Sequence, residues 1–217
     1  AAFGLLLQQA TKGQLDPAFA SPEINRSVWS ETVAAAERHN APGHFTSLIG
    51  WEWSSMPELA NLHRVVLIRE GGDVASQFQP YSSFTSARPE DLWSWLEKTG
   101  ERTGASFLAI PHNSNISNGR MFELVNSDGE PIDADYARTR MKWEKIVEAT
   151  QVKGDSETHA MLSPVDEFAT YEEFTAPHLT DGLAGSYVRS ALRRGLEIEK
   201  RTGVNPYQFG VIGSTDT

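Results

Sequence analysis

Short apolar runs alternate with amphipathic segments along most of the chain. Runs rich in Val, Ile, Phe and Trp are typical of strands. Apolar residues recurring at helical spacing, such as Tyr187, Ala191 and Leu192, indicate the buried face of a helix. This pattern predicts helices at 27–40, 89–99, 134–143 and 186–202, and strands at 45–53, 62–69, 105–111, 145–150 and 207–212.

Helix-breaking residues support these boundaries. Pro42 and Gly43 follow the first predicted helix, Pro89 opens the second, and Gly203 follows the last. Because strands alternate with helices, the order predicts an α/β fold with mostly parallel strands. Two long irregular stretches, 71–88 and 154–183, are expected to be functional loops.

Length and composition narrow the class of protein. The 217 residues suit a single domain over 1–217, and 39% hydrophobic with 22% charged residues is ordinary for a soluble globular protein. A net charge of −10 argues against nucleic acid and anionic membranes as partners. No apolar run is long enough to span a membrane. The absence of cysteine excludes disulfides and thiolate ligands but leaves the compartment open.

Ionisable side chains stand at the ends of the predicted strands. Glu52 ends the first strand, His63 lies in the second, His112 follows the third, Glu148 lies on the fourth and Asp216 follows the last. Working residues of α/β folds collect at one edge of the sheet, and imidazole and carboxylate together are ligands of zinc, manganese and iron. The loop that leaves the fourth strand adds Lys153, Glu157 and His159.

Each of these residues also has a simpler interpretation. Glu52 could be an exposed strand residue, His63 a histidine packed in the core, and Lys153 a solvated surface lysine rather than an anion-binding group. The remaining histidines are predicted to be structural or solvent-exposed: His39 at a helix end, and His44 and His178 in loops.

Four segments resemble a known family. They read LIGWEWSSMPELANLHRVVLIRE, LAIPHNSNISNGRMF, EATQVKGDSETHAMLSPVDEFA and GVNPYQFGVIGSTDT. They look like the family called domain of unknown function 3604, of the PHP (polymerase and histidinol phosphatase) superfamily, from about Asn25 to the end. The resemblance implies a distorted β/α barrel with long loops. It also implies a phosphoesterase-like hydrolase in which a centre of two or three divalent metal ions (Zn, Mn or Fe) activates water against a small anionic substrate.

The resemblance also assigns roles to single residues. Glu52 in Gly-Trp-Glu matches a glutamate that bridges two metals, and His63 and His112 match the histidines of the next two strands. Asp216 matches the aspartate of a closing Asp-x-His motif. Within the family-specific segment, Glu148 and His159 are expected to be further ligands, and Glu157 to take part in catalysis; Lys153 or Arg64 would clamp the leaving anion.

Two family motifs are not matched. PHP proteins open with a His-x-His strand, whereas the first histidine here is His39, and the chain stops one residue before the histidine expected after Asp216-Thr217. We therefore expect an internal piece of a longer, exported protein, truncated at both ends. Such a piece should have an incompletely filled metal site and negligible phosphatase activity, and should form homo-oligomers through an unpaired strand edge.

Two other classes of function compete with the hydrolase. The chain could be a carbohydrate- or ligand-binding module, in which Trp51, Trp53 and Trp143 would stack on a sugar. It could also be a catalytically inactive interaction domain, because expected ligands are missing. Metal analysis of the full-length protein would separate the hydrolase from the sugar-binding module.

Overall fold

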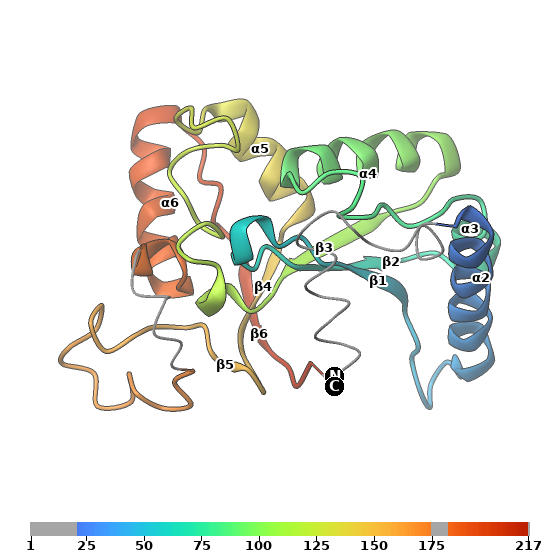
Figure 1. The fold of residues 1–217 in the computed structure, drawn as a ribbon, viewed down its shortest axis with the longest axis horizontal. Coiled ribbons are helices and arrows are strands. Elements are labelled where there is room, and N and C mark those ends of the chain that lie inside the picture. Colours follow the sequence, from blue (N-terminus) through green and yellow to red (C-terminus); the bar gives the residue numbers. More distant parts are fainter. Residues whose placement is uncertain (1–20, 175–181, 217) are drawn as a thin grey trace.

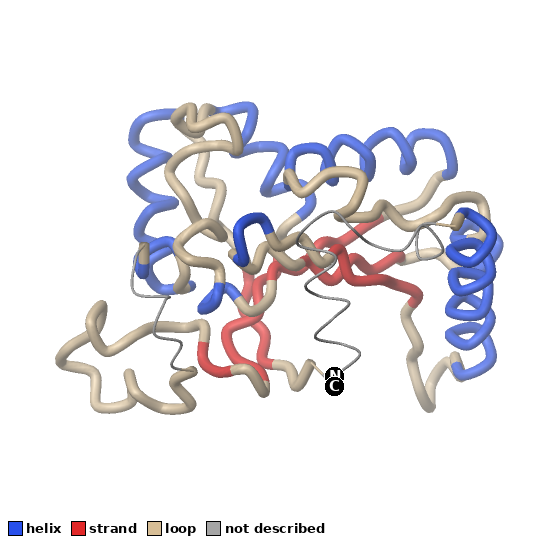
Figure 2. The backbone as a smooth tube through the Cα atoms, in the orientation of Figure 1, coloured by secondary structure: helices blue, strands red, loops and turns tan. Residues whose placement is uncertain are grey.

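The computed structural model describes residues 21–174 and 182–216, which form helices packed around two small sheets (Figures 1 and 2). The helices are α2 (Pro22–His39), α3 (Gly72–Ala75), α4 (Pro89–Thr103), α5 (Ala134–Trp143) and α6 (Val188–Thr202), with single 3₁₀ turns η2 (Pro57–Leu59), η3 (Ser114–Ile116) and η4 (Leu183–Gly185). The strands are β1 (Ile49–Trp53), β2 (Arg64–Ile68), β3 (Phe107–Pro111), β4 (Ile146–Gln151), β5 (Gly154–Asp155) and β6 (Gly210–Gly213).

The predicted elements all have counterparts at nearly the predicted positions. Helix α5 matches its prediction at both ends, and α2 begins earlier than predicted because the Ser21 side chain caps its N-terminus ahead of Pro22. Helix α4 runs on to Thr103, where Gly104 ends it in the left-handed region with φ of 77°. Local patterning therefore defines the elements of this chain.

The expected arrangement of the strands, a β/α barrel with mostly parallel strands, is wrong. Strands β1, β2 and β3 form an antiparallel sheet. In the second sheet, of order β5–β4–β6, only the β4–β6 pair is parallel. The link 54–63 between β1 and β2 is shorter than the crossover of about a dozen residues that a parallel pair requires. Helix α4 lies between β2 and β3 in the chain, yet these strands still pair antiparallel.

The two faces of the first sheet have different surroundings. Trp53 is paired with Arg64 across β1 and β2, and both side chains are buried. They share the side of the sheet that α4 and α5 cover (Figure 1). Because neighbouring strand residues point to opposite faces, Glu52 projects from the other side. The sheet thus separates a helix-covered core from the face that carries Glu52.

A buried ion network joins this sheet to the helices. Glu144, directly after α5, accepts hydrogen bonds from Arg64 Nε and Trp93 Nε1 at 3.0 Å each. Its second oxygen lies 2.9 Å from Arg140 Nη2. Burial opposes ionisation, but the two guanidinium groups hold the pKa of Glu144 below its usual range. One carboxylate therefore links β2, α4 and α5.

The tryptophans considered as a sugar platform belong to the core. Trp53 and Trp143 are buried, at 0% and 7% exposure. Trp51 is partly buried, and its ring packs edge-on against Trp29 at 5.9 Å and Trp95 at 5.7 Å. These three rings are not displayed for stacking on a ligand.

Strand β6 has the most exposed side chains of the second sheet. It lies at one end of the order β5–β4–β6, and Val211 and Ile212 are 52% and 37% exposed. Assembly of homo-oligomers through such an edge stays a prediction. None of the described helices is long and apolar enough to cross a membrane.

Replacing Glu144 with Ala should destabilise the protein by about 3–5 kcal/mol, because it leaves two buried guanidinium groups without their carboxylate. The matched control is Glu97→Ala, which removes a solvent-exposed ion pair with Lys142 and should cost no more than about 1 kcal/mol. Urea unfolding monitored by tryptophan fluorescence measures both. Equal losses would show that the network does not stabilise the core in this way.

Candidate metal centre

Three of the predicted ligands meet on the face of the first sheet opposite the one that α4 and α5 cover. Glu52 lies on β1, His63 directly precedes β2, and His112 directly follows β3. One ligand atom from each lies within 4.8 Å of the others. His63 Nδ1 is 2.7 Å from Glu52 Oε1, and His112 Nε2 is 4.0 Å from Glu52 Oε2. We call these three residues the triad.

The antiparallel register explains why the triad forms. Trp53, Arg64 and Pro111 are aligned across the three strands, so their neighbours Glu52, His63 and His112 lie at the same edge. The backbone N–H of His112 donates to the carbonyl oxygen of His63 at 3.3 Å, which extends the pairing beyond β2. The end of β1, the start of β2 and the end of β3 therefore supply one residue each.

Three of the four ring nitrogens in the triad have no hydrogen-bond partner in the part of the chain that the structure describes. His112 is 1% exposed, and neither of its ring nitrogens has a hydrogen-bond partner among the described residues; the same holds for His63 Nε2. Buried polar atoms are nearly always paired in folded proteins, and orphans indicate an ion, a water or a catalytic role. A divalent cation would take one nitrogen from each ring, so the donor set fits a metal ion.

The charge states of the triad also suit a cation. The hydrogen bond from His63 lowers the pKa of Glu52 to about 2, with Ser54 assisting and burial opposing. Burial lowers the pKa of His112, although the Glu52 charge opposes that shift. At neutral pH the site thus offers an ionised carboxylate and a neutral imidazole, which are the forms that ligate metals.

A second group of charged residues adjoins the triad. Lys153 forms an ion pair with Asp216, and both charges act on the pKa of His112. Burial would raise the pKa of Asp216, but hydrogen bonds from Lys153 and Gln151 lower it below its usual range. Three predicted site residues, Glu148, Lys153 and Asp216, thus lie near the triad.

Glu148 is the one carboxyl of this group that resists ionisation. It is 4% exposed, and one of its oxygens, Oε1, has no hydrogen-bond partner among the described residues. Burial raises its pKa to about 6; a backbone hydrogen bond from Asn113 opposes this, and the charge of Asp216 adds to it. A buried carboxyl with a raised pKa and an unpartnered oxygen can bind either a cation or a proton.

Two amide side chains that were not among the predicted site residues hold Lys153 in place. Asn113 Oδ1 accepts from Gln151 Nε2 at 2.7 Å and lies 3.4 Å from Lys153 Nζ. Gln151 Oε1 in turn accepts from the Lys153 backbone N–H at 2.7 Å. Asn113 has φ of 51°, a left-handed conformation that asparagine tolerates better than most residues. The segment Asn113-Ser114-Asn115 directly after His112 was the sequence signal for polar side chains at this place.

The structure does not bring three of the predicted site residues to the triad. The Arg64 guanidinium is 1% exposed in the helix-side ion network, where it cannot clamp a substrate anion beside the triad. Glu157 pairs with Arg189 at 2.8 Å, and His159 Nε2 with Glu173 at 2.7 Å, both around the segment that precedes α6. Of the other histidines, His39 lies in the last turn of α2, at a helix end as predicted, and His44 is exposed as predicted. His178 lies outside the described residues.

Comparison with known proteins gives one match. The model of the family described as "Protein of unknown function (DUF3604)" matches residues 4–217. No curated protein and no solved structure matches the chain.

The triad should give the chain a measurable affinity for Zn²⁺ or Mn²⁺ that depends on His112. We expect His112→Ala to weaken binding by at least about tenfold, because it removes a buried donor that no other group replaces. The matched control, His44→Ala, removes an exposed loop histidine and should leave the affinity unchanged. Equilibrium dialysis with elemental analysis measures both variants. Equal affinity in the two would exclude the triad as the binding site.

Glu148 should make the stability of the metal-free protein fall as pH rises. Its pKa is about 6 in the folded chain, against 4.5 for an unperturbed glutamate, so the folded state holds its proton more tightly. Relative to Glu148→Gln, the wild type should lose about 2 kcal/mol of unfolding free energy as pH rises from 4.5 through 6. Urea titrations across this range, with chelator present, measure the difference. A difference that does not change with pH would contradict the shift.

Proposed function

The chain belongs to the DUF3604 family, and we propose that it is a metal-dependent hydrolase of the phosphoesterase type. The observation that carries this proposal is the triad itself, in which an ionised carboxylate faces two histidines, and three of their four ring nitrogens lack a hydrogen-bond partner among the described residues. The motifs around Glu52, His63, His112 and Asp216 resemble those of PHP hydrolases, and this supports membership of that superfamily as part of the proposal.

We assign ligand roles by position. Glu52, His63 and His112 would hold a first cation, and the adjoining carboxylates Glu148 and Asp216 are the donors for a further one. Imidazole and carboxylate ligands suit Zn, Mn or Fe. When bound, such cations lower the pKa of a coordinated water toward about 7 and neutralise charge on a phosphoryl group.

The remaining chemistry falls to residues of the chain. Lys153 places an ammonium group beside the triad, where it can hold an anionic oxygen of the substrate and offset charge that develops on it. Asn113 and Gln151 orient the segment that carries Lys153. Glu148, with its pKa near 6, can hold or release a proton close to neutral pH. A small anionic ester is the substrate class that these groups fit.

The full natural protein, supplied with Mn²⁺ or Zn²⁺, should hydrolyse p-nitrophenyl phosphate. Lys153→Ala should lower kcat by about a hundredfold without changing the metal content, because the lysine stabilises charge on the substrate and ligates nothing. Glu52→Gln should lower both activity and metal content. Steady-state kinetics and elemental analysis of the same preparations separate the two effects.

The matched control for Lys153 is Lys142→Ala, which removes an exposed lysine of α5 that pairs with Glu97. Its activity should equal that of the wild type. A protein that binds metal through the triad yet hydrolyses no phosphate ester would refute the hydrolase and leave the metal centre standing. If Lys153→Ala keeps full activity, the lysine has no part in the reaction.

A further inference from the structure

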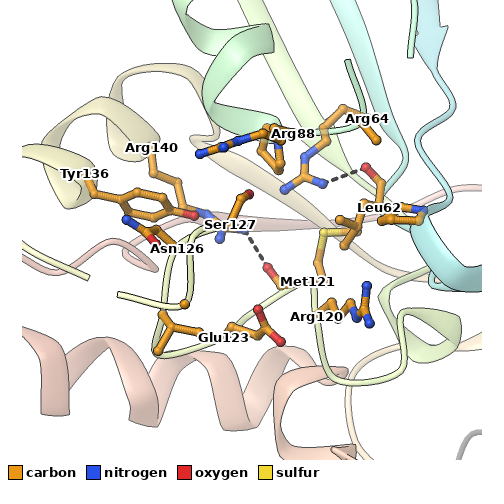
Figure 3. Close-up of a pocket in the computed structure, with 15 residues that line it drawn as sticks. Leu62, Arg64, Arg88, Arg120, Met121, Glu123, Asn126, Ser127, Tyr136 and Arg140 are labelled. Carbon is orange, nitrogen blue, oxygen red and sulfur yellow. Dashed lines mark hydrogen bonds between the residues drawn. The ribbon is translucent and has the colours of Figure 1, made fainter. Parts of the chain in front are cut away.

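A second candidate binding site lies on the opposite side of the first sheet from the triad. It is a cavity between the start of β2, α5 and the loop 120–129, and Figure 3 shows residues that line it. Its volume is about 400 Å³. Four arginines line it: Arg64, Arg88, Arg120 and Arg140. The one acidic residue in its lining is Glu123, whose pKa burial raises above its usual range. The cavity therefore presents mainly positive groups.

The base of the cavity carries more positive than negative charge. Arg64 and Arg140 are both buried, and they share the single carboxylate of Glu144. Their other contacts are neutral: Arg64 Nη1 donates to the carbonyl oxygen of Leu62 at 2.6 Å, and Arg140 Nη2 to that of Met121 at 2.9 Å. A buried charge without a counter-ion is costly. An anion in the cavity would reduce that cost.

Aromatic faces stabilise part of this excess charge. The Arg140 guanidinium lies 4.7 Å from the ring centroid of Tyr207, and the Arg64 guanidinium lies 5.8 Å from that of Trp53. Such contacts stabilise a guanidinium group, and they do so more strongly when it is desolvated. Aromatic rings attract the guanidinium charge but accept no hydrogen bond from its N–H groups. They therefore lower the cost of burying the charge without replacing an anion.

The rim arginines are held by exposed carboxylates. Arg88 donates to both oxygens of Asp128, at 2.8 and 2.6 Å, and Asp128 is 57% exposed. Arg120 pairs with Glu58, which is 79% exposed. Exposed ion pairs contribute little free energy. An incoming anion can therefore take over these guanidinium groups at small cost.

Apolar side chains complete the wall. Leu62, Met121, Val125 and Tyr136 line the cavity together with the arginines. The volume lies within the range of pockets that hold small molecules, and a mostly apolar lining with a few placed polar groups is typical of such sites. The lining thus suits a ligand with an apolar body and one charged end.

We propose that this cavity binds a small organic anion, with a phosphate, sulfate or carboxylate group against the arginines and an apolar body against Leu62, Met121 and Tyr136. The site is separate from the metal centre and does not depend on the proposed hydrolase activity. Arginine suits all three groups because its planar guanidinium donates two parallel hydrogen bonds to paired oxygens.

Calorimetric titration with phenylphosphonate tests this, because its C–P bond resists hydrolysis and its phenyl ring supplies the apolar body. We expect saturable binding of one equivalent, weakened about tenfold or more in the double variant Arg88→Gln/Arg120→Gln. These rim residues are chosen because replacing Arg64 or Arg140 would disturb the buried network with Glu144. Inorganic phosphate, which lacks the ring, should bind more weakly than phenylphosphonate.

Two controls make the result specific. Arg138→Gln removes an exposed arginine of α5 that pairs with Asp135, outside the cavity, and should not change the affinity. His112→Ala should also leave it unchanged, because the triad lies on the other face of the sheet. The proposal is wrong if no saturable binding occurs, if the rim variant binds as the wild type does, or if His112→Ala abolishes binding.

Discussion

The rest of the structure depends on the register of strand β2 in the first sheet. It is the middle strand of the first sheet, hydrogen-bonded to β1 on one side and β3 on the other. Its first residue, Arg64, points into the helix-covered core and meets Glu144. The preceding residue, His63, meets Glu52 on the opposite face. A shift of this strand by one residue would exchange the two faces and lose both the core ion network and the triad.

This arrangement places charges in two very different environments a short distance apart along the chain. On the helix side, the guanidinium groups of Arg64 and Arg140 are fully buried and form ion pairs with one shared carboxylate, that of Glu144. On the other side, three of the four ring nitrogens of His63 and His112 are buried without a hydrogen-bond partner in the described part of the chain. The pKa is shifted down at Glu52 and up at Glu148. Buried ion pairs and hydrogen bonds of the first kind hold a fold together. Buried groups that lack partners and have divergent pKa values are typical of sites that bind or react.

The sequence predicted the helices and strands, the three residues of the triad and several charged residues near it. It did not predict how the strands pair. Apolar runs and breakers locate β1 to β4 and the long helices because these signals are local. The direction of each strand depends on contacts between distant segments. The alternation of helices and strands suggested parallel pairing, whereas the first sheet is antiparallel. Glu52, His63 and His112 still converge, because an antiparallel edge gathers strand ends and strand starts together. Arg64 was misjudged although the predicted strand 62–69 contains both it and His63: neighbouring strand residues point to opposite faces, so these two side chains do not share a site.

Under the proposed function, Lys153 would couple two binding events. Its ammonium group pairs with Asp216 and approaches Asn113. The same positive charge that now neutralises the Asp216 carboxylate is the one proposed to hold the substrate anion. A cation that took Asp216 as a ligand would release Lys153 to the anion, and an anion that drew Lys153 away would free Asp216 for the cation. By thermodynamic linkage, each ligand would raise the affinity for the other by the same factor. Under the proposed function, metal and substrate would then bind with positive heterotropic cooperativity.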